Sequence, residues 1–124
     1  MVESIGIDIA EVARFERLVR RYGDRLVRRV LGRQETETYL SRHDRAAFLA
    51  GRFAAKEAVV KALGKFLTTR PSLSELEIIN DPSGRPRVKL PDYVNVHLRH
   101  VDIQVSISHE KSFAIGLAIC TEKP

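Results

Sequence analysis

The segment 45–63 constrains the fold most strongly, because it is spaced like a helix but has no continuous polar face. At 100° per residue, bulky side chains cover one broad side of this helix and alanines cover most of the other. A helix that is apolar on both sides is buried on most sides. We expect it to end at Gly64, a common residue just past a helix C-terminus. After its first residue, Arg45, four charged residues nevertheless interrupt the apolar pattern: Arg52, Lys56, Glu57 and Lys61.

Shorter elements surround this helix in the sequence. Alternating isoleucines predict a strand over 2–9, and helical spacing predicts helices over 12–22, 25–31 and 35–42. Two short strands, 76–79 and 87–90, flank a turn at 80–84, and a helix is expected from Pro91 to about His100. Strands over 101–108 and 113–120 follow, joined by a loop at 109–112. This order predicts one α+β domain, residues 1–124, in which a small antiparallel-type sheet packs with several helices, including the long buried one.

Composition narrows the function. With 124 residues, 44% of them hydrophobic, the chain has enough apolar surface for one core. The only cysteine, Cys120, excludes a disulfide framework and a multi-cysteine metal site. The chain shows no signal-peptide pattern, and its apolar runs are too short to span a bilayer, so we expect a cytoplasmic protein away from membranes. The net charge of +5 favours an anionic partner.

The positive charge is concentrated between Arg14 and Arg33. This stretch contains eight arginines and only two acidic residues, Glu16 and Asp24. A run of charges is most often just a solvated helix face. The shortage of acidic neighbours weakens that interpretation here, and arginine suits forked contacts to carboxylates or phosphates.

Three places along the chain carry groups suited to catalysis. Asp8 is expected at the end of the first strand, where it either caps the next helix or belongs to a site. Glu57 and Lys61 are spaced i, i+4 and either form a helix salt bridge or share a site. His109 follows a strand with one polar face and is, taken alone, as easily a loop residue. If Asp8 and Glu57 meet in space, the pair would suit Mg²⁺.

Taken together, three motifs resemble the 4′-phosphopantetheinyl transferases, and in particular the short members of that family. The first motif is Gly6-Ile7-Asp8-Ile9 with Arg14, the second is Phe-Ala-Ala-Lys-Glu-Ala-Val-Val-Lys-Ala-Leu-Gly over 53–64, and the third is Ser106-Ile107-Ser108-His109. The resemblance covers nearly the whole chain. Two departures stand out: Lys65-Phe66 replaces a common Thr-Gly pair, and Gly116 replaces a small alanine, which we take to be a minor change.

The resemblance implies transfer of the phosphopantetheine arm of coenzyme A to a serine of an apo acyl carrier protein, as used in fatty acid biosynthesis, with release of adenosine 3′,5′-bisphosphate. It implies that Asp8 and Glu57 bind Mg²⁺ and that Lys61 and His109 act at the phosphates, with Ser108 orienting the histidine. The short family members are homotrimers with sites between subunits, and a helix with two apolar sides would leave one side for another chain. The implied coenzyme A contacts are Arg52, Lys56, Lys61, Gly84, Arg85, Pro86, Ser108 and His109, and the implied carrier-protein contacts are Arg14, Arg17 and Arg21.

Two other functions fit part of the sequence. A small nucleic-acid-binding domain would explain the arginines, but it leaves Asp8 and Glu57 without a purpose and lacks surface aromatics for base stacking. A non-catalytic module that only docks carrier proteins would not need Asp8, Glu57 and Lys61 together. The group that accepts the serine proton stays open between Glu57 and a bound water.

Overall fold

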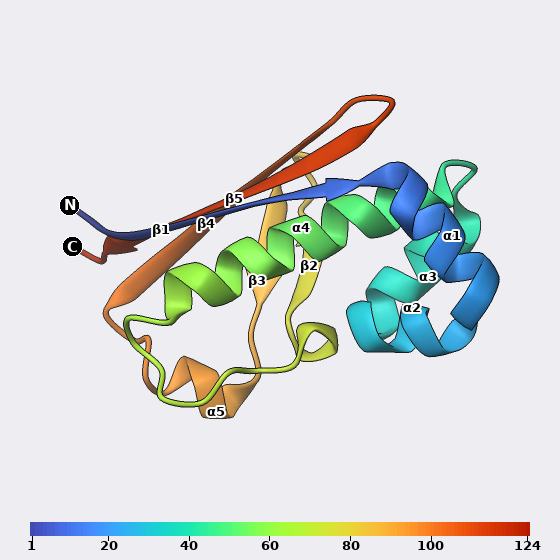
Figure 1. Cartoon of the computed structure of the whole chain (residues 1–124). Helices are drawn as coiled ribbons and strands as arrows, with labels where there is room; N and C mark the ends of the chain where they lie inside the picture. Colours follow the sequence, from blue (N-terminus) through green and yellow to red (C-terminus); the bar gives the residue numbers. More distant parts are fainter.

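An antiparallel sheet lies along one side of the long helix α4 (Arg45–Leu63) in the computed structural model, which describes residues 1–124 (Figure 1). The sheet has the order β1-β5-β4, with β1 at Val2–Glu11, β5 at Phe113–Glu122 and β4 at Val101–His109. Both pairings are antiparallel. The α+β class, the small antiparallel sheet and the long buried helix are therefore confirmed.

The sheet and α4 approach each other closely because only small residues meet between them. A Cβ atom added to Gly6 of β1 would lie 1.8 Å from the carbonyl oxygen of Ala58. One added to Gly116 of β5 would lie 2.4 Å from the Cα of Ala55. The expectation that glycine at 116 is a minor change is wrong, because an alanine there would force the strand away from the helix.

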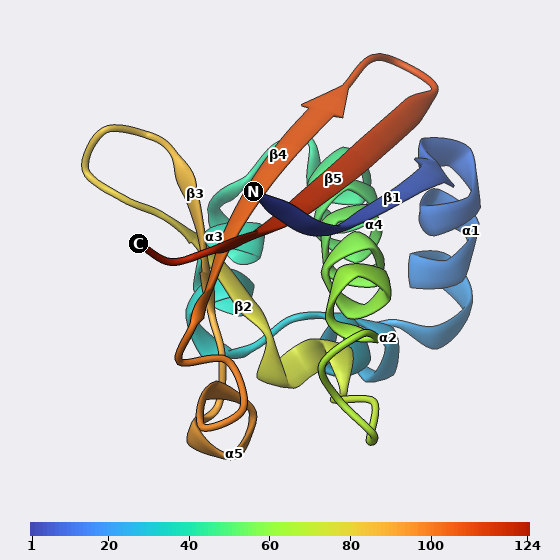
Figure 2. The same cartoon turned by 90° about the vertical axis from the view of Figure 1, so that its left-hand side faces the viewer.

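The remaining elements pack around α4 (Figures 1 and 2). The helices α1 (Val12–Tyr22), α2 (Asp24–Val30) and α3 (Arg33–Ser41) gather at the end where α4 begins. A short 3₁₀ turn, η1 (Leu73–Glu75), leads into a hairpin of β2 (Glu77–Asn80) and β3 (Pro86–Lys89), which a single helical turn, α5 (Asp92–Asn95), follows.

Two predicted boundaries are wrong. The helix expected from Pro91 to about His100 is only the one turn α5, because valine and asparagine are poor helix formers and the chain continues in isolated turns. Strand β1 continues through Glu11, so Asp8 lies within the strand rather than at its end and caps no helix.

The hydrophobic core consists of two clusters that follow each other along α4. One joins α4 to α1–α3 and to Ala10 and Ala114 of the sheet, and the other joins it to the rest of the sheet, β3 and α5. Both sides of α4 are thus buried within its own chain, and the idea that one side faces another subunit is wrong. No helix of the protein combines the length and the apolarity needed to cross a membrane.

The outer face of the sheet is the apolar surface that stays open. Ile5, Ile7 and Ile9 of β1 are each about 60% exposed, because the alternating residues point toward α4. In the antiparallel register they stand opposite Ile119, Leu117 and Ile115 of β5.

Candidate active site

Asp8 and Lys61 meet where β1 crosses α4. The Lys61 ammonium donates to the Ile7 carbonyl oxygen at 2.9 Å and lies 3.2 Å from an oxygen of the Asp8 carboxylate. This contact depends on Gly6, whose missing side chain lets β1 lie directly on the helix backbone. Two motifs that are more than 50 residues apart in sequence therefore form one polar site.

Glu57 lies one turn before Lys61 on the same side of α4. Its carboxylate pairs with Arg70, with 2.7 Å between Oε1 and Nη2, and not with Lys61. The helix salt bridge between Glu57 and Lys61 is therefore absent, and each of the two carboxylates has a different cation partner. Arg70 lies in the loop after α4, and no pattern in the sequence pointed to it.

The donor chemistry of Asp8 and Glu57 fits a magnesium ion. Both side chains are largely enclosed, with 21% and 19% of their surface exposed, and each still has an oxygen without a protein partner. No cluster of three or more metal-ligating side chains occurs in the chain. This agrees with Mg²⁺, which often binds through one or two carboxylates, with water and substrate phosphates filling the other positions.

A cavity of about 280 Å³ opens between α3, α4, the β2–β3 hairpin and the end of β4. It brings together four residues predicted from the sequence: Arg52, Gly84, Pro86 and His109. Sequence reasoning missed several others, because their proximity depends on the packing of α3 and β4 against α4. These lining residues are Thr38, Arg42, Phe48, Asn80 and Ser106.

Arg52 is held over an aromatic ring inside this cavity wall. Its guanidinium carbon lies 4.6 Å from the centre of the Phe48 ring, and that of Arg42 lies 5.3 Å from the same ring. Burial lowers the pKa of Arg52, and the nearby Glu35 carboxylate opposes that shift. The hydrogen bond that Arg42 donates to the Asp44 carboxylate lowers the pKa of Asp44 and raises the pKa of Arg42. Two arginines therefore line the cavity, Arg42 paired with Asp44 and Arg52 beside Glu35.

Three predicted contacts need correction. Lys56 is fully buried, and its ammonium donates to Glu35 and to the Val30 carbonyl oxygen, so it serves the core and does not reach the cavity. Arg85 lines a neighbouring hollow beside Gln104 and does not line this cavity. Ser108 lies in β4 opposite Ile115 and makes no side-chain hydrogen bond to His109, so it does not orient the histidine within this chain.

The arginine-rich segment forms an exposed basic surface over α1, α2 and the start of α3. All eight of its arginines are exposed, and only Arg17 makes an ion pair, with Glu11 at 3.4 Å. Because most of these arginines have no acidic partner, this surface differs from an ordinary helix face on which charges form salt bridges with each other.

A family match identifies the class of protein to which this fold and this site belong. The sequence profile of the 4′-phosphopantetheinyl transferase superfamily matches residues 4–118, and the chain belongs to that family.

Within the family, the chain is similar to holo-[acyl-carrier-protein] synthases. The chain is 38% identical to the holo-[acyl-carrier-protein] synthase of Blochmanniella floridana over 122 residues, covering 96% of this chain and 98% of that one. The crystal structure of the holo-[acyl-carrier-protein] synthase from Neisseria meningitidis aligns with a TM-score of 0.88 at 27% identity, covering 98% of this chain and all of that one. The synthase from Bacillus anthracis in complex with CoA (3′,5′-ADP) aligns at 0.79 and 32% identity, covering 100% and 99% of the two chains.

Proposed function

We propose that this protein transfers the 4′-phosphopantetheine group of coenzyme A to a serine of an apo acyl carrier protein, in the cytoplasm, and releases adenosine 3′,5′-bisphosphate. The observation that carries the proposal is the junction of β1 and α4, where Asp8 pairs with Lys61 one helical turn beyond Glu57. Family membership and similarity to holo-[acyl-carrier-protein] synthases over nearly the whole chain support it.

Asp8 and Glu57 would hold Mg²⁺, whose charge neutralises the diphosphate of coenzyme A during phosphoryl transfer. The Lys61 ammonium, which contacts the Ile7 carbonyl oxygen and Asp8, would stabilise negative charge on the same diphosphate. Arg70 now neutralises Glu57, and its exposed side chain is free to turn toward solvent or toward a phosphate when Glu57 changes partner. Positioning and charge carry most of the catalysis in such reactions.

The cavity that contains Arg52 is the proposed nucleotide site. Arg42, Arg52 and His109 supply cationic or hydrogen-bonding groups for phosphates, and Phe48 supplies an apolar wall. Gly84 and Pro86 close the cavity from the hairpin, where the positive φ of Gly84 (87°) shapes the turn. Arg85 and Ser108 do not line this cavity, so they would contact coenzyme A only in a site completed by another subunit.

The carrier protein would dock on the basic surface of α1. Arg14, Arg17 and Arg21 project from one exposed side of this helix. An acidic carrier protein would be attracted by these charges, which mainly speed and orient association.

The open sheet face supports a homotrimer. Its exposed isoleucines form a contiguous apolar patch with β5, larger than isolated surface residues would give. Ser106 and Ser108 of the edge strand β4 lie on the same sheet and are exposed, so a subunit packed on this sheet could contact them. Sedimentation equilibrium should give three times the chain mass.

Intact-mass spectrometry tests the reaction directly. An apo acyl carrier protein incubated with this protein, coenzyme A and Mg²⁺ should gain the mass of one phosphopantetheine, and a chelator should prevent the gain. The Glu57→Gln variant should lose transfer while remaining folded, because it keeps the size of the side chain. Absence of any gain with several carrier proteins, together with salt-dependent binding of nucleic acid, would instead favour the basic binding domain.

A further inference from the structure

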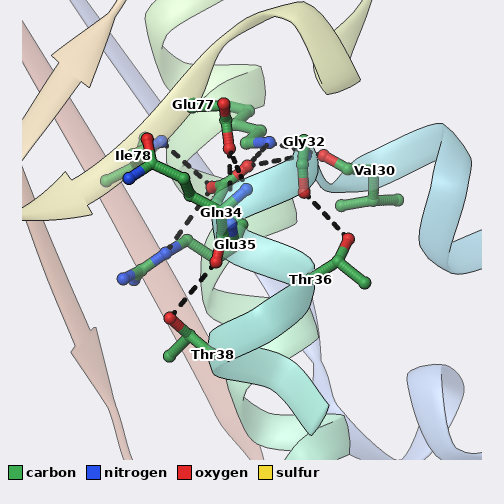
Figure 3. Close-up of polar contacts among 10 residues, drawn as sticks. Val30, Gly32, Gln34, Glu35, Thr36, Thr38, Glu77 and Ile78 are labelled. Carbon is green, nitrogen blue, oxygen red and sulfur yellow. Dashed lines mark hydrogen bonds and ion pairs between the residues drawn. The ribbon is translucent and has the colours of Figure 1, made fainter.

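A buried carboxylate, Glu35, connects the nucleotide cavity to the core. Its side chain is 1% exposed. Figure 3 shows it at the start of α3, surrounded by donors from several elements. One oxygen accepts from the Lys56 ammonium and from the Gly32 amide at 3.0 Å, and the other accepts from the Ile78 amide at 3.0 Å. A carboxylate held from three directions has a fixed position.

Among the side chains that form ion pairs with Glu35, only Arg52 also lines the cavity. Its Nε atom lies 3.7 Å from the second Glu35 oxygen and is buried without a hydrogen-bond partner. An ion-pair contact, and no hydrogen bond, joins Arg52 to Glu35. Glu35 lies at the Nε side of the guanidinium, and the centre of the Phe48 ring lies 4.6 Å from its central carbon. The side chain lines the cavity, and its two Nη groups have no hydrogen-bond acceptor in the chain.

The arrangement gives Arg52 its orientation before a ligand arrives. A free arginine loses considerable rotamer entropy when it binds an anion, and that loss weakens binding. A fixed carboxylate behind the guanidinium removes part of this cost. It also offsets the burial that would otherwise disfavour the charged guanidinium, since a buried charge needs a partner.

We propose that Glu35 is a positioning residue for the nucleotide end of coenzyme A, acting through Arg52. The inference rests on the proposed function, because it takes the Arg52 cavity to be the coenzyme A site. Glu35 touches no substrate itself. Its charge sets where the guanidinium lies, and its loss weakens coenzyme A binding without affecting the carrier protein.

A double-mutant cycle between Glu35→Gln and Arg52→Met tests this role. Calorimetry with coenzyme A and with adenosine 3′,5′-bisphosphate should give a Kd raised by about tenfold in Glu35→Gln, the effect expected for a charge-assisted contact. In the Arg52→Met background, Glu35→Gln should change Kd by less than about twofold, because the two effects share one route. The KM for the carrier protein should stay within about twofold of the wild-type value.

Glu77→Gln is the matched control. Glu77 also holds the start of α3, by accepting from the Gln34 and Glu35 amides, but it makes no contact with Arg52. It should lower thermal stability and leave the coenzyme A Kd unchanged. If Glu35→Gln does not fold, the variant Glu35→Gln/Lys56→Met replaces it, since it leaves no unpaired lysine ammonium in the core.

The outcomes separate the two proposals. Suppose that the wild-type protein binds coenzyme A and transfers its arm. If Glu35→Gln, or the variant that replaces it, then has an unchanged Kd for coenzyme A, the positioning role alone is overturned. The positioning role is also overturned if Glu35→Gln raises the coenzyme A Kd equally in the Arg52→Met background, or if Glu77→Gln raises this Kd as much as Glu35→Gln does. Wild-type protein that binds no coenzyme A and transfers nothing overturns the proposed function and the positioning role with it.

Discussion

Replacing Gly6 with alanine should disturb both the stability and the chemistry of this protein. The new methyl carbon would lie 1.8 Å from the Ala58 carbonyl oxygen, whereas ordinary contact begins at 3.4 Å, so β1 must move off α4 by about 1.6 Å. The obstacle is helix backbone, which cannot turn aside as a side chain does. The neighbouring contacts of Ser4 to the Ala62 carbonyl and of Lys61 to Asp8 would then lengthen beyond hydrogen-bond range.

The magnitudes follow from this displacement. Overpacking of a close-packed site costs about 1–3 kcal/mol, and we expect the upper end because backbone opposes backbone. For a chain of this size that loss lowers the melting temperature by about 10 °C. Transfer activity should fall by about a hundredfold in the folded enzyme, since a displacement of 1 Å at a catalytic group has effects of that order.

Differential scanning calorimetry and the intact-mass assay measure the two effects separately. Gly64→Ala is the matched control, because Gly64 has a helical φ of −57° and its added Cβ would be 3.3 Å from the nearest atom. It should shift stability by less than about 1 kcal/mol and leave activity intact. A Gly6→Ala variant with wild-type melting temperature and activity would show that β1 and α4 do not depend on this close approach.

Four further predictions concern other parts of the chain. Lys56→Met should lower the free energy of unfolding by about 3–5 kcal/mol in urea titrations, because it leaves Glu35 buried and unpaired; a loss below about 1 kcal/mol would contradict the buried pair. Arg21→Glu should raise the KM for the carrier protein several-fold at low salt, with little change in coenzyme A affinity, and unchanged carrier kinetics would remove the docking assignment. Ile7→Asp should convert the proposed trimer to smaller species in sedimentation equilibrium, and an active wild-type monomer would refute the proposed trimer itself. Hydrogen bonds from Ser83 and Arg87 lower the pKa of Asp81, so its contribution to stability should be complete above about pH 4 and be lost as the pH falls through the lowered value; an ordinary pKa by NMR titration would rule this out.

The sequence alone was sufficient to predict the elements whose pattern is local. Alternating isoleucines predicted β1, and the run of bulky residues and alanines predicted a helix buried on most sides, with the bounds that α4 has. The motifs around Asp8, Glu57 and His109 indicated the family. Residue types at short spacings determine these features, because helix and strand periodicity act over a few residues.

Tertiary structure decided which side chains meet. Glu57 and Lys61 have the spacing of a helix salt bridge, yet each pairs with a residue from another element, Arg70 and Asp8. Lys56 and Arg52 look alike on the helix, but Lys56 points into the core toward Glu35, while Arg52 reaches the cavity. The partner of a charged side chain depends on which distant element packs over it, and burial then determines whether that charge stabilises the core or binds a ligand.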